Sequence, residues 1–324
     1  MRPATVAQLR LRDHHPAREP FVADVMAGLR DSPKHISPIY FYDARGSTLF
    51  DRICELPEYY PTRTEMRILE QHGDDIARCI GEDALLVEFG SGSSLKTRSL
   101  LDRLPTLSAY VPVDISRSHL MNAAQGICAS YPGLEVMPVC ADFTRPFALP
   151  VPRKPAARTV VFFPGSTIGN FDPAAALNLL RVMRGVAGAE GGLVVGTDLV
   201  KDTGVLVRAY DDAAGVTAAF NLNVLRRFNN ELGANFSLTH FKHRAVWNAD
   251  ASRIEMHLVS RRKQTATLAD ETIELAKGEH IITEHCHKYT VAGFAAQAAR
   301  ASWRASAHWL DDRAYFSVNY LEAG

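Results

Sequence analysis

The chain has 324 residues and a mass of 35.7 kDa, about twice the ~150-residue size that is common for a single domain. Apolar residues make up 47% and charged residues 22%, a composition typical of globular proteins with a sizeable core, which excludes bulk disorder. Lys plus Arg and Asp plus Glu both number 36. The formal net charge is therefore zero. Without an excess of positive charge to attract a polyanion, we expect neither nucleic acid nor a membrane as a partner.

The five cysteines are scattered and never form a C-x-x-C pair. This spacing argues against a disulfide framework and against a structural zinc site. No stretch approaches the ~20 consecutive apolar residues of a membrane helix, and the first residues do not have the pattern of a secretory signal. We therefore expect a cytoplasmic protein without a metal.

Short apolar runs alternate with helix-like stretches in the first half of the chain. The runs cover residues 84–90, 109–115, 134–143, 159–171 and 191–200, and continuous Val, Leu and Phe predict strands buried on both faces of a parallel sheet. Residues 93–104, 118–131 and 173–187 have helical spacing between them. This alternation predicts a doubly wound, Rossmann-like α/β fold.

The alternation breaks after Lys201. Residues 210–283 contain a helical stretch (213–232) and a segment with period-two character (252–263), and a block of this length must be an inserted subdomain. A helix over 291–302 and strands over 305–312 and 315–323 are then expected to return to the first sheet. We expect residues 20–60 to pack with the insert. The division is therefore 61–200 with 287–324, and 15–60 with 201–286.

A glycine-rich turn follows the first predicted strand, from Gly90 to Lys96, just after the acidic Glu88. Gly90 and Gly92 allow the backbone to approach a ligand at the carboxyl edge of the sheet. Leu95 occupies the third glycine position of the dinucleotide fingerprint, which argues against a nicotinamide dehydrogenase. No P-loop motif is present. A tight turn without any ligand is the alternative.

Acidic residues also end the next two predicted strands. Asp114 lies 24 residues beyond Gly90, where a carboxylate can bind both ribose hydroxyls. Asp142 and Phe143 follow the third strand and offer a carboxylate for an adenine amino group and a ring to flank the base. A single strand-end Asp is usually a turn or cap residue, but three acids at one sheet edge favour an adenosine site.

This arrangement resembles the class I S-adenosylmethionine-dependent methyltransferases. Longer segments are similar to the ergothioneine-pathway histidine Nα-methyltransferases, namely FYDARGSTLFDRICELPEYYPTRTE (41–65), FPGSTIGNF (163–171), GTDLVKDTGVLVRAYDDAAGVTAAFNLNVL (196–225) and RIEMHL (253–258). The resemblance covers nearly the whole chain from Ser37. It implies a methyltransferase domain with a second, substrate-binding subdomain, and Nα-methylation of L-histidine, up to trimethylation, to hercynine. We expect a monomer.

The resemblance also implies roles for individual residues. S-adenosylmethionine would be held by Gly90, Lys96, Asp114, Asp142 and Phe143. The amino acid would contact Tyr59, Asn170, Tyr210, Met256, Glu284 and Cys286, with Phe50 as a further wall. Tyr42 and Asn170 would be the catalytic residues. The amide of Asn170 can bind the substrate carboxylate or amine, or it can cap the helix that follows.

Glu284 and Cys286 are two residues apart on a predicted strand, so they share one face, while His285 and His287 point to the other. A His-Cys-His metal site is therefore not expected. Glu284 can pair with a substrate imidazole. Cys286 stands where the family commonly has serine, and this departure keeps another amino acid, such as tryptophan or tyrosine, as an alternative substrate. A non-catalytic S-adenosylmethionine-binding protein is the other alternative, although Tyr59, Asn170 and Tyr210 argue against it.

Overall fold

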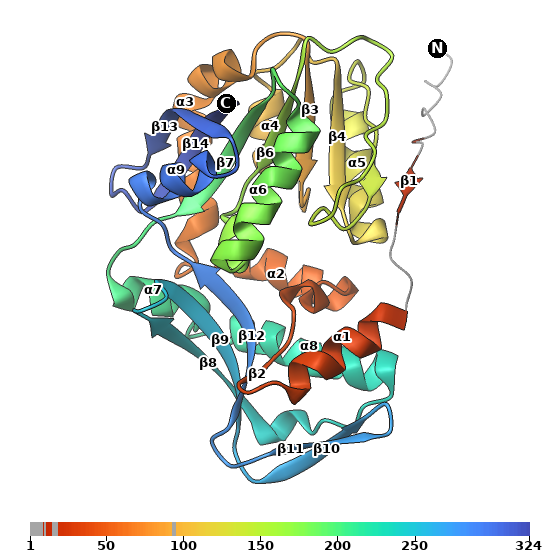
Figure 1. The fold of residues 1–324 in the computed structure, drawn as a ribbon, viewed down its shortest axis with the longest axis vertical. Helices are drawn as coiled ribbons and strands as arrows, with labels where there is room; N and C mark the ends of the chain where they lie inside the picture. The colour runs from red at the N-terminus through yellow and green to blue at the C-terminus, as the bar shows by residue number, and fades with distance from the viewer. Residues whose placement is uncertain (1–8, 10, 15–18, 93–94) are drawn as a thin grey trace.

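The computed structural model describes residues 9, 11–14, 19–92 and 95–324. Within them, the larger unit is an eight-stranded sheet with the order β1-β5-β4-β3-β6-β7-β14-β13 (Figure 1). The strands are β1 (Arg12–Asp13), β3 (Ala84–Phe89), β4 (Ala109–Asp114), β5 (Val139–Cys140), β6 (Arg158–Phe163), β7 (Gly192–Asp198), β13 (Trp303–Leu310) and β14 (Phe316–Ala323). Neighbours pair in parallel except β14, which is antiparallel to β7 and β13. The predicted α/β class and the terminal strand pair are confirmed.

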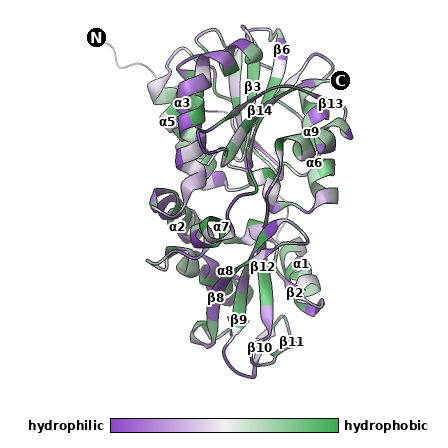
Figure 2. Ribbon diagram, turned by 90° about the vertical axis from the view of Figure 1, so that its left-hand side faces the viewer, coloured by the Kyte–Doolittle hydropathy of each residue, from purple (hydrophilic) through white to green (hydrophobic). Residues whose placement is uncertain are grey.

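Helices cover both faces of this sheet. One face packs against α3 (Tyr60–Ile80), α4 (Leu95–Leu101) and α5 (Arg117–Ser130), and the other against α6 (Pro173–Ala187) and α9 (Val291–Ala299). Successive side chains of β3 alternate between the two cores, and all six are buried. Figure 2 shows the hydrophobic colouring of β3 in the interior of this unit. In the part of the chain that is described, no helix has the length and apolarity needed to cross a membrane.

The third predicted strand is the main local error. Only Val139–Cys140 forms β5, and a single bridge joins Val136 to Tyr110. Pro138 precedes β5 and has no N–H to donate to a ladder, which explains why the apolar run does not pair along its length. In contrast, α6 begins where predicted, because Asp172 accepts from the backbone N–H groups of Ala174 and Ala175.

A smaller unit combines the N-terminal segment with the insert. Its helices are α1 (Glu19–Arg30), η1 (Pro38–Phe41), α2 (Ala44–Glu55), α7 (Thr203–Tyr210), α8 (Val216–Leu232) and η3 (Leu238–His240). Its strands are β2 (Lys34–His35), β8 (Phe241–Asn248), β9 (Arg253–Ser260), β10 (Gln264–Leu268), β11 (Glu271–Leu275) and β12 (His280–His287). They form a sheet with the order β2-β12-β9-β8 and a β10-β11 hairpin. Phe41 from the N-terminal segment stacks on Phe220 of α8 at 4.5 Å, so both segments contribute to one hydrophobic core.

The two units meet where β12 runs up to the larger sheet (Figure 1). A bridge joins Leu199, just after β7, to Tyr289, just after β12. The short helix η2 (Thr167–Asn170) follows β6 and packs on the end of β12. A Cβ atom on Gly169 would lie 2.7 Å from the carbonyl oxygen of His287, so this contact requires glycine.

Candidate active site

Gly90 and Gly92 follow β3 at the carboxyl edge of the larger sheet. Gly90 (φ +73°) and Gly92 (φ +40°) adopt left-handed backbone conformations that favour glycine. Ser93 and Ser94 of the predicted turn lie outside the described residues. The nearest side-chain atom to a Cβ built on Gly90 belongs to Phe143, at 3.8 Å. The backbone of this turn and the ring of Phe143 therefore border the same space.

Glu88 anchors the base of the turn. Its carboxylate is buried and accepts from Thr97 Oγ1 at 2.7 and 2.8 Å and from Tyr110 Oη. Burial raises the pKa of Glu88 to about 8, although the bonds from Tyr110 and Thr97 oppose that shift. This acid ties β3 to α4 and β4.

The next two acids have local partners at the same edge. Asp114 is partly buried and accepts from the N–H of Ser116 at 2.8 Å, and burial raises its pKa. Asp142 accepts from Thr144 N at 3.0 Å and from Thr144 Oγ1 at 2.6 Å. These are the turn contacts typical of a strand-end Asp. The ring of Phe143 packs 5.5 Å from that of Phe89, measured between centroids.

Lys96 joins the turn to the fourth parallel strand. Its ammonium lies 2.6 Å from Glu65 Oε2 on α3. Glu65 is buried and also accepts from the N–H of Gly165 at 2.8 and 3.0 Å. Lys96 therefore faces Gly165 and the turn after β6.

A cavity lies between this edge and the smaller unit. Its walls come from the N-terminal segment, the turn after β6, the insert and β12. The lining residues are Tyr42, Phe50, Ile53, Tyr59, Gly165, Thr167, Asn170, Ala209, Tyr210, Thr217, Phe220, Met256, Glu284 and Cys286. The structure thus brings together every residue that the sequence assigned to the amino-acid substrate, together with Tyr42 and Phe50.

Acidic and phenolic groups share the cavity wall. Burial raises the pKa of Glu284 to about 7, while the Lys288 ammonium and the neighbouring Asn170 side chain act in the opposite direction. Burial, with smaller contributions that include Glu284 and Asp114, raises the pKa of Tyr42 well above its usual range. Tyr42 and Glu284 line the same cavity. Asp172, and not Asn170, caps α6, so the cap alternative for Asn170 is wrong.

Strand β12 presents two different faces. Glu284 pairs in register with Met256 of β9, and both line the cavity with Cys286. The rings of His285 and His287, which alternate with these residues, lie 6.3 Å apart and are not part of the lining. Among the described residues, no group of three or more His, Cys, Asp and Glu side chains is arranged to hold a metal ion.

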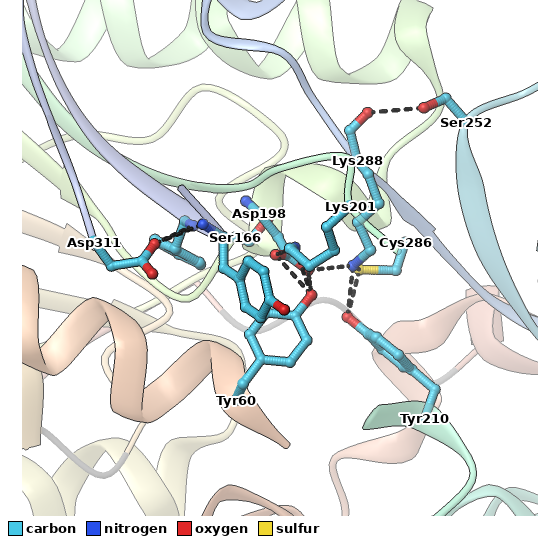
Figure 3. Close-up of polar contacts among 11 residues, drawn as sticks. Tyr60, Ser166, Asp198, Lys201, Tyr210, Ser252, Cys286, Lys288 and Asp311 are labelled. Carbon is cyan, nitrogen blue, oxygen red and sulfur yellow. Dashed lines mark hydrogen bonds and ion pairs between the residues drawn. The ribbon is translucent and has the colours of Figure 1, made fainter. Parts of the chain in front are cut away.

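A buried ionic network lies directly behind the cavity wall (Figure 3). Asp198 at the end of β7 accepts from Tyr60 Oη at 2.7 and 2.9 Å and from the ammonium groups of Lys201 and Lys288. Lys288 also donates to Tyr210 Oη at 2.9 Å and to Cys286 Sγ at 3.0 Å. The network thereby connects the larger sheet to two residues of the cavity.

Sequence reasoning missed this network, although two signals were present. Asp198 ends the fifth parallel strand, so it obeys the same strand-end rule as Asp114 and Asp142. Lys288 continues the period-two series of Glu284 and Cys286 on one face of the extended chain. Together they place Asp198 and Lys288 at the carboxyl edge of the larger sheet, where the two side chains form an ion pair.

The fold and this edge define a class I S-adenosylmethionine-dependent methyltransferase. The backbone at Gly90, the acid that ends β4 and the ring of Phe143 could provide backbone, carboxylate and aromatic contacts to an adenosine at this edge. The comparisons with known proteins identify the family. Residues 21–323 match the family of histidine-specific, SAM-dependent methyltransferases, and the chain belongs to it.

Similar proteins cover nearly the whole chain. A histidine N-alpha-methyltransferase of Mycolicibacterium smegmatis is 45% identical over 94% of this chain and 95% of its own length. One from Mycobacterium tuberculosis is 42% identical over 91% and 92%, respectively. Ergothioneine biosynthesis protein 1 of Neurospora crassa is 31% identical over 63% of this chain and 24% of its own length. The predicted enzyme class, a SAM-dependent histidine methyltransferase, is confirmed.

Proposed function

We propose that this chain methylates the α-nitrogen of L-histidine, up to trimethylation, and so forms hercynine for ergothioneine biosynthesis. The observation that carries the proposal is the cavity in which Asn170, Glu284 and Cys286 meet three tyrosines beside the strand edge. The names of the mycobacterial and Neurospora relatives support the α-nitrogen and the pathway.

The cofactor is assigned to the edge of the larger sheet. When bound, S-adenosylmethionine supplies an electrophilic methyl group on its sulfonium. We assign the ribose hydroxyls to Asp114, the adenine to Asp142 and Phe143, and the amino-acid end to Gly90 and Lys96. The open backbone at Gly90 and the position of the Phe143 ring support this assignment.

The amino acid is assigned to the cavity. Tyr59, Tyr210 and Asn170 would bind the α-carboxylate and amine, with the Tyr210 oxygen accepting from the amine. Glu284 and Cys286 would bind the imidazole, with Met256 and Phe50 as walls. The proximity of Glu284 and Asn170 supports one binding region for both ends of the small molecule.

Tyr42 and Asn170 are assigned to the reacting nitrogen. Their task is to hold the neutral amine in line with the methyl group, since positioning supplies most of the catalysis in such a displacement. The raised pKa of Tyr42 keeps its hydroxyl protonated, so it offers a neutral polar contact. Hydroxyl and amide groups adapt to an amine that gains methyl groups more readily than a fixed carboxylate, which suits repeated transfer.

We also propose that 61–200 with 287–324 form the cofactor domain and 15–60 with 201–286 the substrate domain, of which residues 15–18 lie outside the described part. The separate hydrophobic cores of the two units support this division. The free thiols of the cysteines support the expected cytoplasmic location. A monomer remains the expectation.

The test is incubation of the protein with S-adenosylmethionine and all the standard amino acids, followed by mass spectrometry. We expect the mono-, di- and trimethyl forms of histidine to accumulate, with methylation on the α-nitrogen in fragment spectra. Preferred methylation of tryptophan or tyrosine would replace the substrate, and cofactor binding without any methylated product would indicate a non-catalytic binding protein.

A further inference from the structure

Lys288 lies behind the cavity, just after β12, and its side chain is fully buried. Its ammonium lies 2.7 Å from Asp198 Oδ2, 2.9 Å from Tyr210 Oη and 3.0 Å from Cys286 Sγ. An ammonium has three N–H donors and no acceptor. All three donors therefore have partners, two of which line the cavity (Figure 3).

The position and charge of this ammonium are fixed from behind. Asp198 is fully buried, and its carboxylate also accepts from Tyr60 and Lys201. Burial alone would lower the pKa of Lys288, but Asp198 and its other neighbours outweigh burial and raise it well above its usual range. Lys288 is thus a permanent donor that cannot accept a hydrogen bond.

Because Lys288 only donates, it limits the directions in which the phenol hydrogen of Tyr210 and the thiol hydrogen of Cys286 can point. Burial raises the pKa of both groups, so each keeps its hydrogen. Tyr210 Oη and Cys286 Sγ lie 2.8 Å apart, so one of them donates to the other. Neither hydrogen can point at Lys288. One hydrogen of the pair therefore remains, and the cavity is the open direction for it.

Glu284 requires a hydrogen-bond donor from the substrate ring, whereas the Tyr210–Cys286 pair requires an acceptor. Its ionised carboxylate only accepts hydrogen bonds. Glu284 and Cys286 are two residues apart on β12 and both line the cavity. A ring between them must therefore donate on one side and accept on the other. Neutral imidazole does both, whereas imidazolium and pyrrole rings only donate.

We propose that Lys288 is a positioning residue that makes the Tyr210–Cys286 pair a hydrogen-bond donor to the substrate ring, so that the cavity selects a neutral imidazole. The ring would place its unprotonated nitrogen toward the pair and its N–H toward Glu284. This inference rests on the proposed placement of the imidazole. It gives Cys286 a definite role, because a thiol and a hydroxyl can both act as the donor.

The test compares kcat and KM for L-histidine with those for two analogues, 3-(pyrrol-2-yl)-L-alanine and 3-(pyrrol-3-yl)-L-alanine. Both analogues carry a ring N–H and no acceptor nitrogen. The wild type should favour histidine over both isomers. In Lys288→Met the remaining hydrogen is free to turn away from the ring, so the ratio of kcat/KM values should fall about tenfold, mainly through KM.

Lys201→Met is the matched control. Lys201 donates to the same carboxylate and to Tyr60 Oη at 2.7 Å, and neither partner is among the cavity-lining residues. The ratio should stay within about twofold in this variant. An unchanged ratio in Lys288→Met, or an equal fall in both variants, would overturn the inference. Failure of the wild type to methylate histidine would instead overturn the proposed function.

A second set of variants decides the question if Lys288→Met does not fold, as judged by thermal unfolding and by binding of S-adenosylhomocysteine. In Tyr210→Phe the thiol hydrogen still serves the ring, and in Cys286→Ala the phenol hydrogen does. Each single variant should retain the preference for histidine, and the double variant should lose it. Loss of the preference in either single variant, or its retention in the double variant, would overturn the inference.

Discussion

At the scale of single residues, the acids at the sheet edge have the same chemistry and different surroundings. Glu88 is fully occupied by Thr97 and Tyr110, and Asp142 is occupied by Thr144. Asp114 is partly buried beside the open glycine turn. Glu88 is thus the anchoring acid, whereas Asp114 and Asp142 make the local turn contacts of strand-end acids at the edge of the sheet.

Asp114→Ala should weaken cofactor binding strongly. The carboxylate is assigned to two ribose hydroxyls, and one hydrogen bond to a charged group contributes about 1.5–3 kcal/mol. Affinity for S-adenosylhomocysteine, measured by calorimetry, should therefore fall at least about tenfold. Asp312→Ala, on an exposed turn, is the control and should bind normally. Wild-type affinity in Asp114→Ala would contradict the ribose assignment.

The protonation of Glu284 should control histidine turnover. Burial raises its pKa to about 7, so the carboxyl mostly carries an O–H donor below that pH and only accepts hydrogen bonds above it. We expect kcat/KM for histidine to rise with pH through about 7. Titration of free histidine contributes to the same profile, so Glu284→Gln is measured in parallel.

In Glu284→Gln, the component of the rise that belongs to the enzyme should disappear, because an amide does not titrate in this range. The difference between the two profiles then reports Glu284 alone. Profiles of identical shape would show that this carboxyl does not need to ionise for turnover.

At the scale of one element, β12 separates function from stability on its two faces. Glu284 and Cys286 line the cavity, whereas His285 and His287 lie on the other face of β12, near Arg253. Burial, with a further contribution from Arg253, lowers the pKa of His285 to about 4, and His287 is lowered for the same reasons. Both rings are therefore neutral in the folded protein at neutral pH.

This face should make the protein sensitive to acid. Between about pH 6.5 and about pH 4 the unfolded chain binds protons that the folded state excludes, so the free energy of unfolding should fall as pH falls through this range. Above about pH 6.5 these groups contribute no pH dependence. Urea unfolding at several pH values gives the free energy of unfolding as a function of pH, and this free energy should change less steeply with pH in His285→Gln than in the wild type. His308→Gln, at an exposed position of β13, should keep the wild-type slope.

At the scale of the whole molecule, Asp198 links the two units. It ends β7 of the larger sheet and binds Lys288, which follows β12 of the smaller sheet. The pKa of Asp198 is lowered because Lys288 and Lys201 outweigh the effect of its burial. One buried carboxylate therefore compensates two buried ammonium groups at the junction.

Asp198→Asn should destabilise the fold considerably. Removing one partner of a buried ion pair leaves uncompensated charge and costs about 3–5 kcal/mol. Denaturant unfolding measures this loss. Asp202→Asn is the matched control, because Asp202 is an exposed N-cap of α7 and asparagine caps nearly as well as aspartate. A loss below about 1 kcal/mol in Asp198→Asn would mean that the lysines shed their charge instead.

The sequence by itself determined the features that depend on local pattern. Buried apolar runs predicted β3, β4, β6 and β7, and an Asp-Pro start predicted α6, because side-chain periodicity and capping are properties of neighbouring residues. The strand-end acids were predictable for the same reason, since parallel strands end at one edge of a sheet. The residues of the cavity were named through the family resemblance, which no local pattern replaces.

Only the tertiary structure decided which distant residues meet. Tyr59 and Tyr210 lie 6.0 Å apart between ring centroids, and the lysine two residues beyond Cys286 pairs with the last residue of β7. Pro138 shortened a strand that its apolar neighbours predicted. Side-chain period specifies the face on which a residue lies, but its partner depends on how sheets and helices pack across the chain, and this packing brings Lys288 to Tyr210 and Cys286.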